Sequence, residues 1–297
     1  MRYLAPLFPV IENYRENLWA RHGSRDLPET DKPHHRCGTA HALSTNSLAS
    51  IKEIKGLKIG ILTEGFGIDG GEADVDEAVM LALSVLEKAG VMLKEISIPA
   101  HPTAALAILP LYPEGTKLLY DTNLGGALGN TFYPSSIMAA FGRAKESHSH
   151  ELPLNFKLNS ISGFYAQRRS NGRFYAKAQN VRPTITKQFL DEFEKVDVLS
   201  MPTVPRKANA YKDPIDYKDA IDQTLFGGER GSDIELIIAN TAPYNYTGFP
   251  AIALPCGKSN DLPVSMQLVA PHFREDLLIQ IAHKYQRSVD WRSFAPK

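Results

Sequence analysis

Residues 57–98 read LKIGILTEGFGIDGGEADVDEAVMLALSVLEKAGVMLKEISI. The apolar run at 57–62 and a second run at 91–98 predict two strands, and the segment between them has the period of a helix. The whole stretch predicts a βαβ unit. Because a helical crossover of this kind joins parallel neighbours, we expect the two strands to be parallel.

The helix of this unit has a start signal, a stop signal and one apolar stripe. Asp74 and Glu77 form a D-x-x-E capping pattern with Asp74 as the N-cap. Gly90 stands where a C-cap glycine belongs. The stripe has helical spacing and consists of Val75, Val79, Ala82, Leu83 and Leu86.

The rest of the chain completes an α/β pattern. Residues 102–196 are expected to be mostly helical, and their last apolar stripe consists of Ile185, Phe189, Leu190 and Phe193. Further predicted elements are strands at 196–201, 251–254 and 264–269 and a closing helix around 277–285. The short link after residue 254 allows the last two strands to pair as a hairpin. The expected fold class is α/β, with a mixed β-sheet flanked by helices.

Composition indicates a globular protein of one large or two smaller domains. The 297 residues include 33 Lys and Arg, 33 Asp and Glu, and only 2 Cys. Zero net charge argues against nucleic acid as a partner. The low cysteine content fits a reducing compartment, so we expect a cytoplasmic protein. The apolar stretch at 104–111 is far shorter than a bilayer span, and no cleavage site follows the N-terminus, so we expect neither a membrane segment nor a signal peptide.

The N-terminal region has a different character from the rest. Residues 1–52 include a polar stretch without any period, interrupted by Pro28, Pro33 and Gly38. We leave 1–52 unassigned and expect a loop or disorder there. Residues 53–297 form the region in which order is expected.

Several blocks of the ordered region resemble the amidase signature family. Residues 240–257, NTAPYNYTGFPAIALPCG, are similar to its N-T-x-P-x-x-x-T-G-x-P-x-x-x-x-P-x-G block. Residues 262–269, LPVSMQLV, resemble its L-P-V-G-x-Q strand, with Ser265 where glycine is usual. The stretches 197–203 and 57–66 also fit. The resemblance covers about 53–297 and is greatest to the bacterial amidases of nitrile and amide metabolism.

The resemblance implies hydrolysis of a carboxamide to a carboxylate and ammonia. The family uses a Ser-Ser-Lys triad and a Gly- and Ser-rich oxyanion loop, which precede the strand that matches 57–62. Only 56 residues precede Leu57 here, and they contain no such loop. We therefore expect a partial amidase-signature fold with the N-terminal catalytic half missing, and we assign no catalytic residue.

The site residues implied by the resemblance are few. In the family, the loop that matches 240–244 lies near the substrate, so Asn240 and Thr241 are predicted to bind substrate. A packing or turn role is the alternative for both. The aromatic group Tyr244, Tyr246 and Phe249 either lines a pocket or packs the core.

Several other patterns in the sequence have simple structural explanations. Gly65 to Gly70 match G-x-G-x-x-G, but the acidic residues that follow would repel a pyrophosphate, so we expect a flexible loop and no cofactor. His34, His35, Cys37 and His41 lack the standard spacing of zinc ligands, and a solvated loop is expected instead of a metal site. His148 and His150 are read as surface residues and Cys256 as a buried structural thiol.

Three functions follow from these observations. The first is a truncated amidase, either a gene fragment, a product of a mis-called start, or one part of a split enzyme. The second is a non-catalytic subunit that binds a partner through an open sheet edge, either as a homo-oligomer or with a complementing chain. The third is the subunit that supplies ammonia for transamidation of aminoacyl-tRNA, which shares the family fold. A small-molecule amide is the expected substrate once the missing half is supplied.

Overall fold

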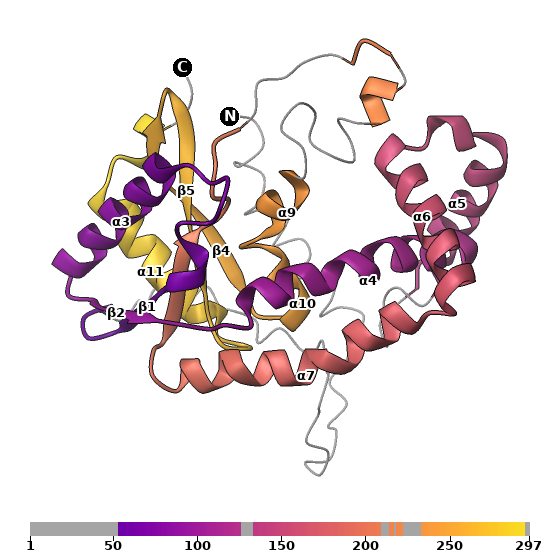
Figure 1. The fold of residues 1–297 in the computed structure, drawn as a ribbon. Coiled ribbons are helices and arrows are strands. Elements are labelled where there is room, and N and C mark those ends of the chain that lie inside the picture. The colour runs from indigo at the N-terminus through magenta and orange to yellow at the C-terminus, as the bar shows by residue number, and fades with distance from the viewer. Residues whose placement is uncertain (1–52, 126–132, 209–213, 217, 222–232, 295–297) are drawn as a thin grey trace. The chain divides into compact units, whose positions relative to one another are not determined.

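The computed structural model describes residues 53–125, 133–208, 214–216, 218–221 and 233–294 (Figure 1). The prediction for residues 1–52 lies outside this part of the chain. Strands and helices alternate over 58–96 and again towards the C-terminus, and the long middle segment is helical. No helix in the described part combines the length and the apolar character needed to cross a bilayer.

One five-stranded sheet with the order β2-β1-β3-β5-β4 holds the fold together. Its strands are β1 (Lys58–Leu62), β2 (Met92–Ile96), β3 (Val198–Pro202), β4 (Ala251–Ser259) and β5 (Leu262–Val269). β1 is parallel to β2 and to β3, whereas β5 is antiparallel to β3 and to β4. The predicted mixed sheet, the parallel βαβ unit and the C-terminal hairpin are therefore confirmed.

Two helices cover one face of the sheet. They are α3 (Ala73–Lys88) and α11 (Glu275–Ser288), which lie together in Figure 1. Every residue of the predicted α3 stripe is buried, and it packs against strand residues such as Ile59 and Val198. Gly90, with φ +98°, follows the helix in the left-handed conformation that glycine adopts freely.

The prediction of Asp74 as the N-cap of α3 is wrong. The helix begins at Ala73, its N-cap is Glu72, and no side chain caps it. The Asp74 carboxylate instead binds Lys207 and Ser259, which come from distant parts of the chain. A D-x-x-E pattern shows that a carboxylate stands near a helix start, but tertiary partners decide where it binds.

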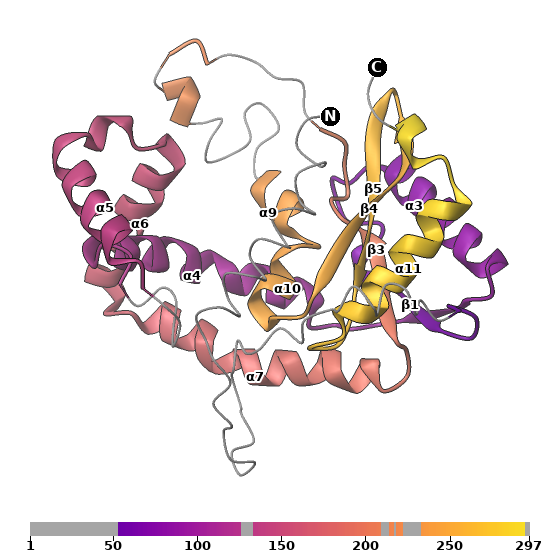
Figure 2. The same cartoon turned by 180° about the vertical axis from the view of Figure 1, so that it is seen from behind.

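Parts of three helices cover the other face: the start of α4 (His101–Asp121), the end of α7 (Arg173–Phe193) and the short α10 (Ala242–Thr247). The other helices of this region are α5 (Ser135–Ser147), α6 (Leu154–Ser170) and α9 (Asp233–Ile238), and Figure 2 shows α5 and α6 at the far end of α4, away from the sheet. Ile185 and Phe189 of α7 are buried against this face as predicted, but Leu190 is 41% exposed. Leu190 lies about 100° around the helix from Phe189, so it leaves the stripe.

We refer to α4, α5, α6 and α7 as the helical arm. Its first and third helices approach very closely at Gly163, which is the only buried residue of α6. A Cβ atom at Gly163 would lie 2.1 Å from the Pro113 carbonyl oxygen of α4. Only glycine allows the two backbones this contact.

The Gly163→Ala substitution tests this contact. It should lower the free energy of unfolding by about 1–3 kcal/mol, because the added methyl group forces α4 and α6 apart. Urea unfolding followed by circular dichroism measures the loss. Gly115→Ala in α4 is the matched control, since its Cβ would meet nothing within 4 Å. The control should be neutral or stabilised by up to about 1 kcal/mol. Equal midpoints for both variants would contradict close packing at Gly163.

Candidate functional site

The candidate site lies where the parallel strands β1 and β3 end. In α/β sheets, ligands bind beyond the carboxyl ends of parallel strands. β1 continues into a short 3-10 turn (Thr63–Gly65), and β3 ends at Pro202. A Cβ atom at Gly65 would lie 2.6 Å from the Met201 Cβ, so glycine lets the turn rest directly on β3.

Asn240 joins these two strand ends. Its side-chain Nδ2 donates to the Gly65 carbonyl oxygen at 2.9 Å and to the Pro202 carbonyl oxygen at 2.8 Å. Its backbone carbonyl accepts from Nε2 of Gln267 on β5 at 2.6 Å. Asn240 is completely buried, so a single residue ties β1, β3 and β5 together beneath the site.

The remaining atom of the Asn240 amide contacts a buried histidine. Oδ1 lies 2.9 Å from Nε2 of His101, the first residue of α4. Because both hydrogens of the Asn240 amide are donated to carbonyls, Oδ1 accepts and His101 Nε2 carries the proton. His101 is 1% exposed, and its Nδ1 has no hydrogen-bond partner. His101 is not among the residues predicted from the sequence, because no local pattern connects it with Asn240.

The surroundings of His101 favour its neutral form. Burial is the main influence and lowers the pKa of the imidazole, while the hydrogen bond to Asn240 and the charge of Glu64 act in the opposite direction. Glu64 is itself held by the Ser97 hydroxyl at 2.5 Å and by the Ile98 backbone N–H at 2.9 Å. His101 therefore completes a polar network under the site rather than serving as an exposed base.

Thr241 differs from Asn240 in its surroundings. It is partly exposed at the start of α10, and its side chain does not cap that helix. Its backbone carbonyl accepts from the Asn245 side chain at 3.1 Å. Substrate binding by Asn240 and Thr241 stays a prediction. For Asn240, every polar atom of the side chain is already bound to the protein.

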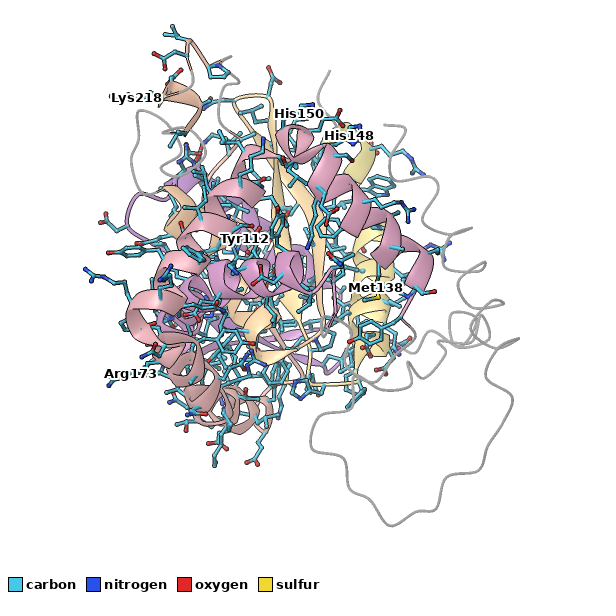
Figure 3. All side chains as sticks on the ribbon, turned by 90° about the vertical axis from the view of Figure 1, so that its right-hand side faces the viewer. Tyr112, Met138, His148, His150, Arg173 and Lys218 are labelled. Atoms are coloured by element: carbon cyan, nitrogen blue, oxygen red, sulfur yellow. The ribbon has the colours of Figure 1, made fainter. Side chains whose placement is uncertain are left out.

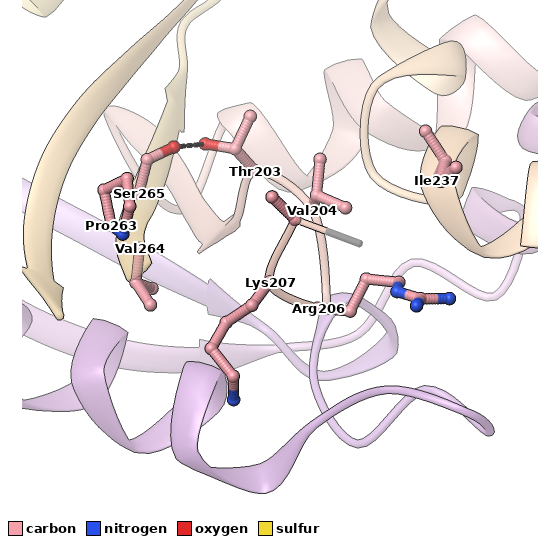
Figure 4. A pocket seen from close by; sticks show the side chains of 9 residues that line it. Thr203, Val204, Arg206, Lys207, Ile237, Pro263, Val264 and Ser265 are labelled. Atoms are coloured by element: carbon pink, nitrogen blue, oxygen red, sulfur yellow. Dashed lines mark hydrogen bonds between the residues drawn. The ribbon is translucent and has the colours of Figure 1, made fainter. Parts of the chain in front are cut away.

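An open pocket of about 320 Å³ lies beside the end of β3 (Figure 4). The turn after β3 and the start of β5 form its walls, with Ile237 of α9 opposite. The Ser265 hydroxyl donates to the Thr203 hydroxyl at 2.6 Å, and the Thr203 N–H donates to the Ser265 carbonyl at 2.9 Å. Ser265, which replaces the usual glycine of the motif, thus places a hydroxyl in this pocket.

The Lys207 side chain points away from these hydroxyls towards α3 (Figure 4). It pairs with Glu72 at 2.9 Å and with Asp74. Burial disfavours the lysine charge, but the hydrogen bonds and charges of Asp74 and Glu72 outweigh it and raise the lysine pKa. Lys207 is therefore a charged structural residue and not the neutral base that amide hydrolysis by a serine requires.

Serine hydroxyls of the described residues contact an imidazole at Ser147 and carboxylates at Ser97 and Ser259, and none of these serines lines the pocket beside β3. Ser147 Oγ lies 2.6 Å from His148 Nδ1, but both are exposed, and the hydroxyl also bonds the Arg143 carbonyl. An exposed pair of this kind lacks the water-excluded setting in which oxyanion donors are effective. No hydrogen bond between a serine hydroxyl and a lysine ammonium group occurs in the described part.

Cys256 is an inert thiol in this fold. It is 7% exposed, and its Sγ lies 3.6 Å from the Val264 carbonyl oxygen. Burial raises the pKa of the thiol to about 12. The structure therefore confirms the interpretation of Cys256 as a buried structural thiol.

The structure also describes the glycine-rich loop after β1 and the histidines at 148 and 150. The Gly67 N–H donates to Asp76 Oδ2 at 2.8 Å, so a carboxylate occupies part of the glycine-rich loop. His148 and His150 are exposed surface residues, as predicted (Figure 3). No group of three metal-ligating side chains occurs among the described residues. The cluster from His34 to His41 lies outside them.

The strand ends and the Asn240 network fall within a stretch that matches a known family. A family model described as Amidase matches residues 27–279. The chain belongs to the amidase family. The match also takes in the hairpin of β4 and β5, and it begins within the segment 1–52 that sequence reasoning left unassigned.

The part of each relative that aligns with this chain is about half of that relative's length. The chain is 31% identical over 259 residues to a glutamyl-tRNA(Gln) amidotransferase subunit of Synechococcus sp. (strain JA-3-3Ab), covering 84% of this chain and 46% of that protein. It is 30% identical to the corresponding subunit of Bacillus pumilus, covering 97% and 56%. The chain thus spans about half the length of the curated relatives it matches.

A solved amidase structure supports the fold. The structure of 6-aminohexanoate cyclic dimer hydrolase complexed with substrate has a TM-score of 0.60 and 20% identity, covering 84% of this chain and 49% of that one. At this identity the similarity supports the fold alone. The α/β class with a mixed sheet expected from the sequence agrees with this similarity, and the missing catalytic half stays a prediction.

The Asn240→Asp substitution tests the junction of the strands. It should lower the free energy of unfolding by roughly 2–4 kcal/mol, because it removes two buried donations and sets a carboxylate against two carbonyl oxygens. Urea unfolding measures the effect. Asn245→Asp is the control: Asn245 is exposed, and the change should stay within about 0.5 kcal/mol. A loss at Asn240 no larger than at Asn245 would contradict the junction.

His101 should make stability depend on pH. Its pKa is lowered in the folded state relative to about 6.5 in the unfolded chain. The unfolded state then binds more protons below that value, so stability is complete above pH ~6.5 and falls as the pH drops, by at most about 1.4 kcal/mol per pH unit. His101→Gln should flatten this part of the curve, whereas His148→Gln should leave it unchanged. Parallel curves for the wild type and His101→Gln would exclude His101 as the cause.

Proposed function

We propose that this chain takes part in the hydrolysis of a carboxamide to a carboxylate and ammonia. The observation that carries the proposal is the family match over residues 27–279. The chain contributes the part of the amidase fold that contains the strand ends and the Asn240 network. The Ser-Ser-Lys triad of the reaction lies, in this proposal, on polypeptide outside the residues described here.

The pocket at the end of β3 forms one wall of the substrate site in this proposal. Two hydroxyl groups, from Thr203 and Ser265, face each other there and offer hydrogen bonds to an amide. Thr241 lies at the start of α10 with its side chain partly exposed. Asn240 acts as a positioning residue, because its side-chain amide holds the strand ends instead of reaching the ligand.

A second candidate function is that of one component of a larger assembly. It is favoured by the two relatives that are glutamyl-tRNA(Gln) amidotransferase subunits, as their names state. In that case the same amide chemistry supplies ammonia to a reaction carried out elsewhere in the assembly. The substrate class, a carboxamide, is common to both candidates.

Release of ammonia from a panel of small aliphatic and aromatic amides tests the proposal. The purified chain should give no more ammonia than the buffer blank. The chain fused to the segment of the Bacillus pumilus protein that it does not match should release ammonia above the blank. In the fusion, Cys256→Ser should leave turnover unchanged, because the thiol is buried and protonated.

Two results would contradict this proposal. Turnover by the chain without the added segment would place the nucleophile within these 297 residues. A folded fusion that releases no ammonia from any amide would overturn amide hydrolysis as the function. Replacing the nucleophilic serine of the added segment by alanine is the matched control for activity of the fusion.

A further inference from the structure

Helix α4 has the composition of a buried helix but is only partly covered. Residues 104–112 read AALAILPLY, eight residues without a polar side chain followed by a tyrosine. A helix that is apolar on all sides is normally enclosed by other elements. Within this stretch only Ala104 and Ala105 are buried, while Leu106 is 49% exposed and Tyr112 is 55% exposed.

Helix α6 presents a second apolar stripe to solvent. Ile161, Phe164 and Tyr165 are spaced at i, i+3 and i+4 and are 65%, 47% and 60% exposed. Ile161 and Tyr165 lie on the side of the helix opposite Gly163, which contacts α4. The buried side of α6 is therefore used inside the arm. The neighbours of its apolar stripe are the long cationic side chains of Lys117, Arg168 and Arg169, and the stripe itself stays largely exposed.

A basic groove borders this stripe. It has a volume of about 660 Å³ and lies where α6 meets α7, lined by Arg169, Arg173 and Lys177 together with Phe174. Phe174 is 62% exposed. Residues 168–182 include five basic residues and no acidic one. Arg173 and Tyr112 are both visible on the side of the molecule drawn in Figure 3.

We propose that these exposed side chains form the docking surface for the part of the amidase fold that this chain does not span. We call this the apolar arm surface, and it consists of Leu106, Tyr112, Ile161, Phe164, Tyr165 and Phe174. The inference rests on the proposed function, in which other polypeptide supplies the catalytic triad. The occupant is that polypeptide, whether it is joined to this chain or separate.

The coverage of the relatives points to this occupant, and the basic groove sets the charge that it should carry. The matched relatives contain about as much chain again as the segment that this protein spans, and that remainder must pack somewhere on the shared fold. The basic groove calls for a partner with an apolar centre and a carboxylate rim. A second copy of this chain fits less well, because a twofold contact at α6 and α7 would bring two basic segments together.

Binding to a defined probe tests the docking surface. The probe is the segment of the Bacillus pumilus amidotransferase protein that this chain does not match, produced separately with an affinity tag. Ile161→Glu and Phe174→Glu should each weaken its binding at least tenfold. Leu81→Glu on α3 is the matched control, since Leu81 is 63% exposed but lies outside the arm, and it should change binding less than twofold.

Charge reversal supplies a further variant at the same surface. Arg173→Glu should also weaken binding, and its effect should shrink as salt is added, because the contact is electrostatic. Far-UV circular dichroism should show the same fold for all four variants, since each changed side chain is exposed.

Three results would overturn the docking surface: no complex with the unaltered chain, equal binding by the Ile161 and Leu81 variants, or a homodimer of this chain that Ile161→Glu dissociates. A complex that forms through the surface but releases no ammonia would leave the docking surface standing and overturn the proposed function. Ammonia release that is insensitive to the arm variants would overturn the docking surface and leave the proposed function standing. The two proposals can therefore fail separately.

Discussion

The side-chain amide of Asn240 is the interaction on which the candidate site depends. Its two donated hydrogen bonds hold the ends of β1 and β3 at a fixed separation, and Gln267 of β5 bonds its backbone. In a dry interior such bonds are strong, and each unpaired donor or acceptor would be costly. Three strands from distant parts of the chain therefore reach the same edge in one arrangement.

The buried residues that hold the strand ends in place are different from the residues whose hydroxyls line the pocket. Asn240, His101 and Glu64 form a polar network that is satisfied inside the protein except at His101 Nδ1. Lys207 is engaged by two carboxylates. The hydroxyls of Thr203 and Ser265 remain at the pocket wall. Among the described residues, these hydroxyls lie in a pocket and no serine is hydrogen-bonded to a lysine, and the proposed function builds on both features.

The helical arm contains far fewer buried residues than the sheet. β3 is buried along its whole length, whereas no residue of α5 and only Gly163 of α6 are buried. Apolar side chains on the arm face solvent in a chain that spans about half of its curated relatives. An exposed apolar patch of this kind is typical of an interaction site, and the docking surface proposed above rests on it.

The order of polar and apolar side chains along the chain was enough to predict the local elements, because strand and helix periods depend on nothing else. The βαβ unit, the buried α3 stripe and the hairpin of β4 and β5 follow from it, and the motifs at 240–257 and 262–269 indicate the family. The partners of Asn240 became known from the three-dimensional fold alone, since they are 175, 139, 38 and 27 positions away. The same holds for the contacts of Asp74 with Lys207 and Ser259. No period links positions so far apart, because their contacts depend on how the whole sheet assembles.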